Sequence, residues 1–175
     1  MAIAFGDVFF VPQKFNPKYG GHYAVVLGLD KAQKQVYLQS LSSRMYKIFP
    51  NFGSFRNIFC SFCSADTKRS DFQKQLSGKY TPVGVDNVIF LNFKKEPYKN
   101  FLSKETFVCL KRFEKDNLFD FDYRVTKGDY KYQGNFTKLN CKLAIVTARE
   151  SDQITTPEMS NMLEFFKQTY VTNKA

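Results

Sequence analysis

Two neighbouring stretches decide the fold, GDVFFVP at residues 6–12 and GHYAVVLG at residues 21–28. Each contains a continuous apolar run bounded by glycine or proline, which is typical of a buried strand flanked by turns. The polar residues 30–34 then predict a turn, and QVYLQSL at residues 35–41 predicts a third strand. A short connection of this kind favours an antiparallel meander.

Further elements are expected along the rest of the chain. Apolar runs predict strands at 88–93 and 106–110, and the alternating aromatic and charged residues 116–135 predict a hairpin that turns at Lys127-Gly128-Asp129. Residues 143–146 fit a strand or a buried helical turn, and residues 51–82 are expected to form an insertion. We interpret the 175 residues as a single domain, 1–175.

The clearest helix is predicted at 157–170, near the C-terminal end. Thr156 is suited to the N-cap, Pro157 to the first turn and Glu158 to the positive helix end. Apolar residues at helical spacing then predict one buried face, made by Met159, Met162, Leu163, Phe166 and Tyr170. The fold class expected from these elements is mainly β within an α+β arrangement.

The charge balance indicates an acidic or polyanionic partner. Lys and Arg number 26 against 16 Asp and Glu, a formal net charge of +10. The first residues do not have the pattern of a secretory signal, and no apolar stretch is as long as a transmembrane helix. We therefore expect a cytoplasmic protein with no membrane partner.

The cysteines do not indicate a disulfide framework. There are four in the whole chain, Cys60, Cys63, Cys109 and Cys141, too few for a disulfide scaffold of this length. Cys60 and Cys63 form a lone CxxC, whereas a structural zinc site needs four ligands. We expect no metal and no cofactor.

The motifs at 6–12 and 21–28, with Leu41-Ser42-Ser43-Arg44 and the downstream Pro50, resemble those of the MazF/PemK-like toxin endoribonucleases. That family has a GDxxxV strand, a strand of the form RPAVVLS and a third strand that ends in Pro-x-Thr-Ser. The Ser-Ser-Arg segment is also similar to an element of the ToxN-like branch. The resemblance implies a small SH3-like antiparallel barrel with helical decorations and a C-terminal helix.

The same resemblance implies a function. Such enzymes cleave single-stranded RNA without metal and leave a 2′,3′-cyclic phosphate, as toxins of toxin–antitoxin or phage-defence systems. The resemblance leaves open whether the chain has an antitoxin, either an acidic protein or an RNA, and whether it forms a homodimer.

Carried over by position, the catalytic roles fall on His22, on Ser42 or Ser43, and on Arg44. His22-Tyr23 stands where the family has Arg-Pro, and a histidine suits proton transfer near neutral pH. Ser42 or Ser43 would hydrogen-bond a phosphate oxygen, and Arg44 would stabilise the developing charge. Basic and aromatic side chains nearby are the expected RNA contacts: Lys14, Lys18, Tyr19, Tyr23, Tyr46 and Lys47.

Two other functions fit the same residues. The strand around His22 is also similar to one in papain-fold hydrolases of the LRAT and NlpC/P60 kind, in which His22 would be the base and Cys141 the nucleophile. A non-catalytic SH3-like module that binds RNA is the other alternative.

Overall fold

The computed structural model describes residues 2–12, 21–42, 88–104, 106–110 and 112–171. Several predictions concern residues outside these ranges: the insertion at 51–82, the Cys60–Cys63 pair, and the site residues Lys14, Lys18, Tyr19, Ser43, Arg44, Tyr46 and Lys47.

The five predicted strands are confirmed, with ends that differ by no more than a few residues. They are β1 (Asp7–Val11), β2 (His22–Asp30), β3 (Gln35–Ser42), β4 (Val88–Leu91) and β5 (Thr106–Cys109). Two short polar strands complete the described set: β6 (Glu114–Asn117), which was not expected, and β7 (Lys131–Asn135), which lies in the second half of the predicted hairpin. All neighbours pair antiparallel in the order β4-β5-β3-β2-β1-β7, and β6 also pairs with β3.

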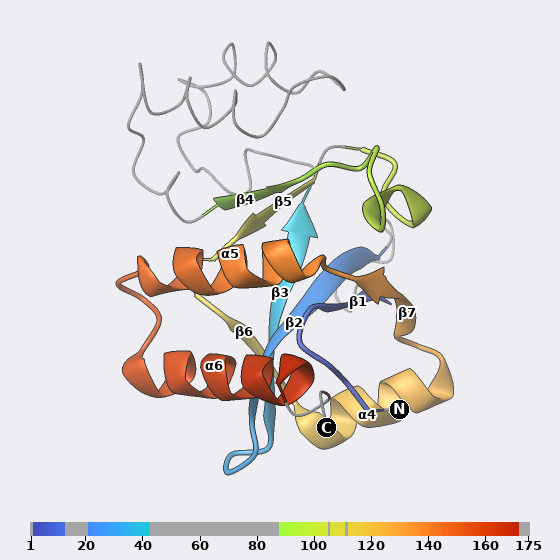
Figure 1. Cartoon of the computed structure of the whole chain (residues 1–175). Coiled ribbons are helices and arrows are strands. Elements are labelled where there is room, and N and C mark those ends of the chain that lie inside the picture. The colour runs from blue at the N-terminus through green and yellow to red at the C-terminus, as the bar shows by residue number, and fades with distance from the viewer. Residues whose placement is uncertain (1, 13–20, 43–87, 105, 111, 172–175) are drawn as a thin grey trace, which may run out of the picture.

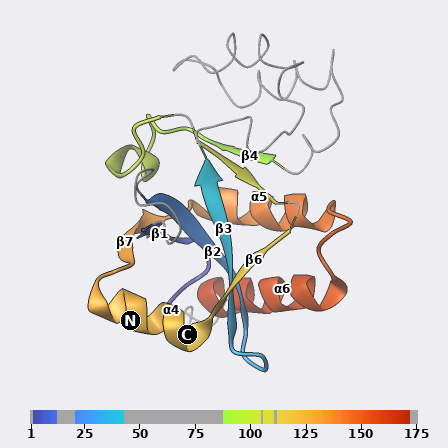
Figure 2. The same ribbon diagram turned by 180° about the vertical axis from the view of Figure 1, so that it is seen from behind.

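The predicted closed barrel is wrong, because no pairing within the described ranges joins the edge strands β4 and β7. Helices cover the core instead. Helix α5 (Lys138–Arg149) packs against β4, α6 (Thr156–Tyr170) packs against β2, and the short helix η4 (Tyr98–Asn100) lies beside β7. Figures 1 and 2 show α5 and α6 side by side across one face of the sheet. The coarser expectation of an α+β fold with antiparallel strands and a C-terminal helix is confirmed.

Helix α6 and its N-cap each begin one residue earlier than predicted. Thr155, not Thr156, is the cap, and it forms a capping box with Glu158. The box satisfies two backbone N–H groups that the first helical turn leaves without partners. Met162 and Phe165 are the buried apolar residues of the helix, and four of the predicted face residues are partly buried against the core: Met159, Leu163, Phe166 and Tyr170.

The predicted hairpin at 116–135 is wrong, because its first half forms helix α4 (Leu118–Lys127) and its second half contains β7, which pairs with β1. The Asn117 side chain caps this helix by accepting hydrogen bonds from the backbone N–H groups of Phe119 and Asp120. Gly128 ends it in the left-handed conformation at φ 84°. The ambiguous segment 143–146 is also helical, as part of α5.

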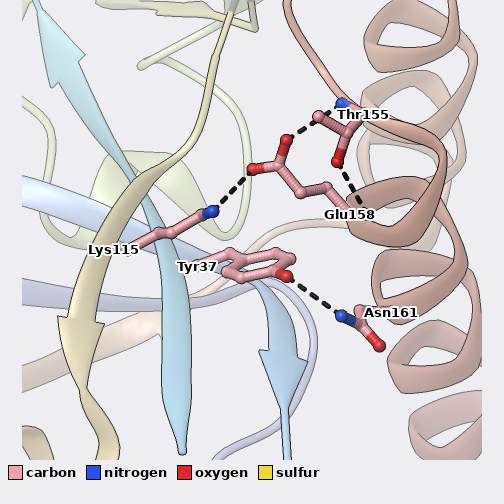
Figure 3. A network of polar contacts seen from close by, with 5 residues as sticks. All are labelled: Tyr37, Lys115, Thr155, Glu158 and Asn161. Carbon is pink, nitrogen blue, oxygen red and sulfur yellow. Dashed lines mark hydrogen bonds and ion pairs between the residues drawn. The ribbon is translucent and has the colours of Figure 1, made fainter. Parts of the chain in front are cut away.

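A polar network joins α6 to the sheet (Figure 3). Lys115 on β6 lies 3.1 Å from the Glu158 carboxylate, which also accepts the Thr155 backbone N–H at 2.9 Å. Asn161 donates to the Tyr37 hydroxyl at 3.0 Å. Burial alone would raise the pKa of Glu158, but the hydrogen bonds and the Lys115 charge outweigh it and hold that pKa below its usual value.

Candidate functional site

The candidate site lies where β2 begins and β3 ends. The register pairs Val11 with His22 and Ala24 with Ser40. The β2–β3 pairing ends at Ala24 and Ser40, two residues short of His22 and Ser42, and β5 flanks Ser42 through Phe107. The two strand ends on which the catalytic residues were predicted therefore each lie within two residues of the last β2–β3 pair.

One face of the sheet carries the polar groups of this region. Residues two apart on a strand, and residues directly opposite in an antiparallel pair, present their side chains to the same face. By this rule His22, Ala24 and Ser40 share a face, and so does Glu114, which pairs with Leu38. His22 and Ser40 are partly exposed, and Glu114 is exposed.

Ser40 holds the Glu114 carboxylate on this face. The Ser40 hydroxyl lies 3.3 Å and 3.2 Å from the two carboxylate oxygens of Glu114 and donates to them. If the Ala24–Ser40 register continued by two residues, Ser40 would be diagonal to His22, at about 7–8 Å between Cα atoms. Sequence reasoning missed both Ser40 and Glu114, because the polar strand β6 has no apolar pattern that would place it beside β3.

Tyr23 does not belong to this face. Its ring lies 5.4 Å from that of Phe10 and 5.9 Å from that of Phe101, between centroids, on the other side of the sheet. The side chain is partly buried. Tyr23 therefore contributes to packing on that side of the sheet, and its role as an RNA contact stays a prediction.

The geometry does not support a Cys141–His22 pair. A Cβ placed on Gly6 would lie 2.7 Å from the Cys141 sulfur, so Cys141 sits beside Gly6, just before β1. His22 lies opposite Val11, at the far end of that strand. Five residues of strand separate the two places by about 16 Å, too far for proton transfer between the side chains.

The Cys141 thiol is also in the wrong environment for a nucleophile. The residue is fully buried, its sulfur lies 3.4 Å from the Tyr170 hydroxyl, and burial raises its pKa to about 11. Nucleophilic cysteines have lowered pKa values, because the thiolate is the reactive form. Cys141 is a core residue here.

Two observations bear on ligands and membranes. Among the described residues, no group of three or more His, Cys, Asp and Glu side chains could hold a metal ion. No helix in those same ranges is both long enough and apolar enough to span a bilayer.

Comparisons with known proteins found no match that bears on the site. No protein-family model matches the chain, and no curated protein sequence matches it at a significant level.

Proposed function

We propose that the chain is a metal-independent endoribonuclease that cleaves single-stranded RNA, acting in the cytoplasm as the toxin of a toxin–antitoxin or phage-defence system. The observation that supports this most is the placement of His22, Ser40 and Glu114 on one face, beside the end of β3. The net charge of +10 suits a polyanionic substrate.

The reaction needs two proton-transfer groups. The 2′-hydroxyl oxygen attacks the adjacent phosphorus and loses its proton to a base, while the 5′-oxygen leaves and receives a proton from an acid. The products are a 2′,3′-cyclic phosphate and a 5′-hydroxyl end. An imidazole and a carboxylate can fill these roles, so we assign the two proton transfers to His22 and Glu114. Ser40 is a positioning residue, because its hydroxyl holds the carboxylate.

The remaining site residues of the proposal come from the resemblance. Ser42 or Ser43 would donate a hydrogen bond to a phosphate oxygen, and Arg44 would neutralise the negative charge that develops on the non-bridging phosphate oxygens. Lys14, Lys18, Tyr19, Tyr46 and Lys47 would hold the strand.

The decisive experiment compares two oligonucleotides. Purified protein is incubated in EDTA with a fluorescent single-stranded RNA and with the same sequence in DNA, which has no 2′-hydroxyl. We expect cleavage of the RNA alone, with a 2′,3′-cyclic phosphate on the upstream product, detected by mass spectrometry. The variants His22→Ala and Glu114→Gln should each cut about 10²–10⁴-fold more slowly, the usual contribution of a general acid or base.

Two controls make the result specific. Glu164→Gln changes an exposed carboxylate on α6 and should cut like the parent protein. Ser40→Ala should lower the rate less than Glu114→Gln, because it frees the carboxylate without removing it. Cleavage of the DNA oligonucleotide, or unchanged RNA cleavage by His22→Ala, would refute this mechanism.

A non-catalytic RNA-binding module is the second candidate, and exposed aromatic rings favour it. Phe119 and Tyr123 on α4 are 62% and 58% exposed, and Tyr132 on β7 is 48% exposed. Lys34 and Lys127 lie over the rings of Phe119 and Tyr123, at 5.1 Å and 5.0 Å from the centroids. Aromatic faces beside cations stack bases without sequence preference. If the protein binds RNA but never cuts it, and Phe119→Ser with Tyr123→Ser weakens that binding, this function replaces the first.

A further inference from the structure

Helix α5 has an outward face that no element of the described chain covers. Leu139 and Val146 are 67% and 52% exposed, and Leu143 between them is partly buried against the core. These residues follow at spacings of four and three, so they form one stripe over two turns. We call this row of three residues the α5 stripe.

A row of cations runs beside the α5 stripe. Lys138, Lys142 and Arg149 are all exposed, and at 100° per residue they lie within about 40° of one another around the helix axis. Lys138 also lies over the Tyr170 ring, 5.5 Å from its centroid. Among the described residues, no carboxylate forms an ion pair with Lys142 or Arg149. On the inner side of the same helix, Cys141, Ala144 and Ala148 are buried in the core.

From these observations we propose that the outer face of α5 docks an acidic amphipathic helix of a partner protein. Aliphatic side chains against aliphatic side chains would form the centre of the contact, and carboxylates of the partner would pair with the cation row. Charge complementarity identifies the occupant, because three cations line one edge of the α5 stripe. The acidic residue nearest to the stripe in sequence is Glu150, at the C-terminal end of the helix.

Two other kinds of partner fit less well. RNA bases stack best on aromatic rings, and the α5 stripe has none, with leucine and valine at its centre. A bilayer needs a broad apolar face, and the α5 stripe spans about 10 Å of one helix with three side chains. The proposal does not depend on the ribonuclease activity, because α5 contributes no residue to the site at His22.

The test uses a synthetic probe of stated sequence pattern. A fluorescein-labelled 16-residue peptide carries leucines at positions i, i+3, i+4 and i+7 and glutamates on the adjoining positions. A second peptide has the same composition in scrambled order. Fluorescence anisotropy with the full chain should show saturable binding of the amphipathic peptide and at least tenfold weaker binding of the scrambled one.

Two paired variants locate the contact. Leu139→Gln with Val146→Gln, and Lys142→Glu with Arg149→Glu, should each weaken binding at least tenfold, while far-UV circular dichroism and RNA cleavage stay at the parent level. Val171→Gln and Lys167→Glu, on the exposed end of α6, are the matched controls and should leave the affinity unchanged.

Three results would overturn the proposal. The first is equal affinity for both peptides, and the second is an equal loss of affinity in the control variants. The third is a chain that does not bind the peptide but binds vesicles of phosphatidylserine and phosphatidylcholine through Leu139 and Val146. Loss of RNA cleavage in the His22 variant has no bearing on any of them.

Discussion

Gly6 precedes β1 at a point where the chain has no room for a side chain. Its φ is +90°, its N–H donates to the Val26 carbonyl, and its own carbonyl accepts the N–H of Phe136, both at 2.8 Å. A Cβ here would lie 2.7 Å from the Cys141 sulfur and 3.3 Å from the Cβ of Phe136. Gly6→Ala therefore introduces both backbone strain and overlap.

The expected cost follows from these two terms. A side chain at positive φ costs about 1–2 kcal/mol. An extra methyl in a packed core costs about 1–3 kcal/mol. Gly6→Ala should therefore lower the free energy of unfolding by about 2–5 kcal/mol.

A second substitution separates the two terms. Cys141→Ala removes the sulfur, so in the double variant the new methyl occupies the vacated space. The overlap term should then vanish, and the two substitutions should show a favourable coupling of about 1–3 kcal/mol. The backbone term of about 1–2 kcal/mol should remain.

Urea denaturation monitored by circular dichroism measures all four proteins of this cycle. A loss of 2–5 kcal/mol at an m-value of about 2 kcal/mol/M moves the midpoint by roughly 1–2.5 M. Strictly additive effects, or a Gly6→Ala variant as stable as the parent, would show that Gly6 is not confined by Cys141 as we argue.

Four further outcomes are expected. The pKa of Glu158 is lowered in the folded protein, so its contribution to stability is present above about pH 4.5 and lost as the pH falls below that value. In urea titrations, Glu158→Gln should therefore reduce the loss of unfolding free energy at acid pH. The pKa of Cys141 is raised to about 11, so stability should decline as the pH rises above about 9, and Cys141→Ala should remove that part of the decline. Leu163→Asp places a carboxylate against the core and should cost about 2–4 kcal/mol in urea unfolding, whereas Glu164→Ala on the exposed side of α6 should cost little. RNA affinity should fall linearly on a plot of log K against log salt, and a flat plot would contradict an electrostatic interface.

The sequence predicts an element well where one local signal dominates. The apolar runs at β1 and β2 have no competing interpretation, and the capping residues of α6 placed its start to within one residue. The α4 segment was mistaken for a strand because Phe119, Phe121 and Tyr123 alternate with aspartates, a period of two. The helical cap at Asn117 and the left-handed Gly128 are the signals that would have corrected it.

The sequence could not predict which strands pair over long distances in the chain. The antiparallel pairing of β2 with β3 needed only one short turn, and the register shows it as far as Ala24 and Ser40, two residues short of His22 and Ser42. The pairing of β3 with both β5 and β6 joins residues more than 60 positions apart. Glu114 enters the candidate site only through that pairing, so local pattern could not find it.

The way in which β5 lies between β3 and β4 has an evolutionary consequence. Ser42 and Phe90 both pair with Phe107, from opposite sides, so β3 and β4 lie about 10 Å apart there, two strand spacings. Closing a longer connection costs only about 0.6 kcal/mol for each doubling of its length. Descendants of this chain could therefore change the number of residues between Lys47 and β4 at little cost in stability, while β3 and β4 keep their places on either side of β5.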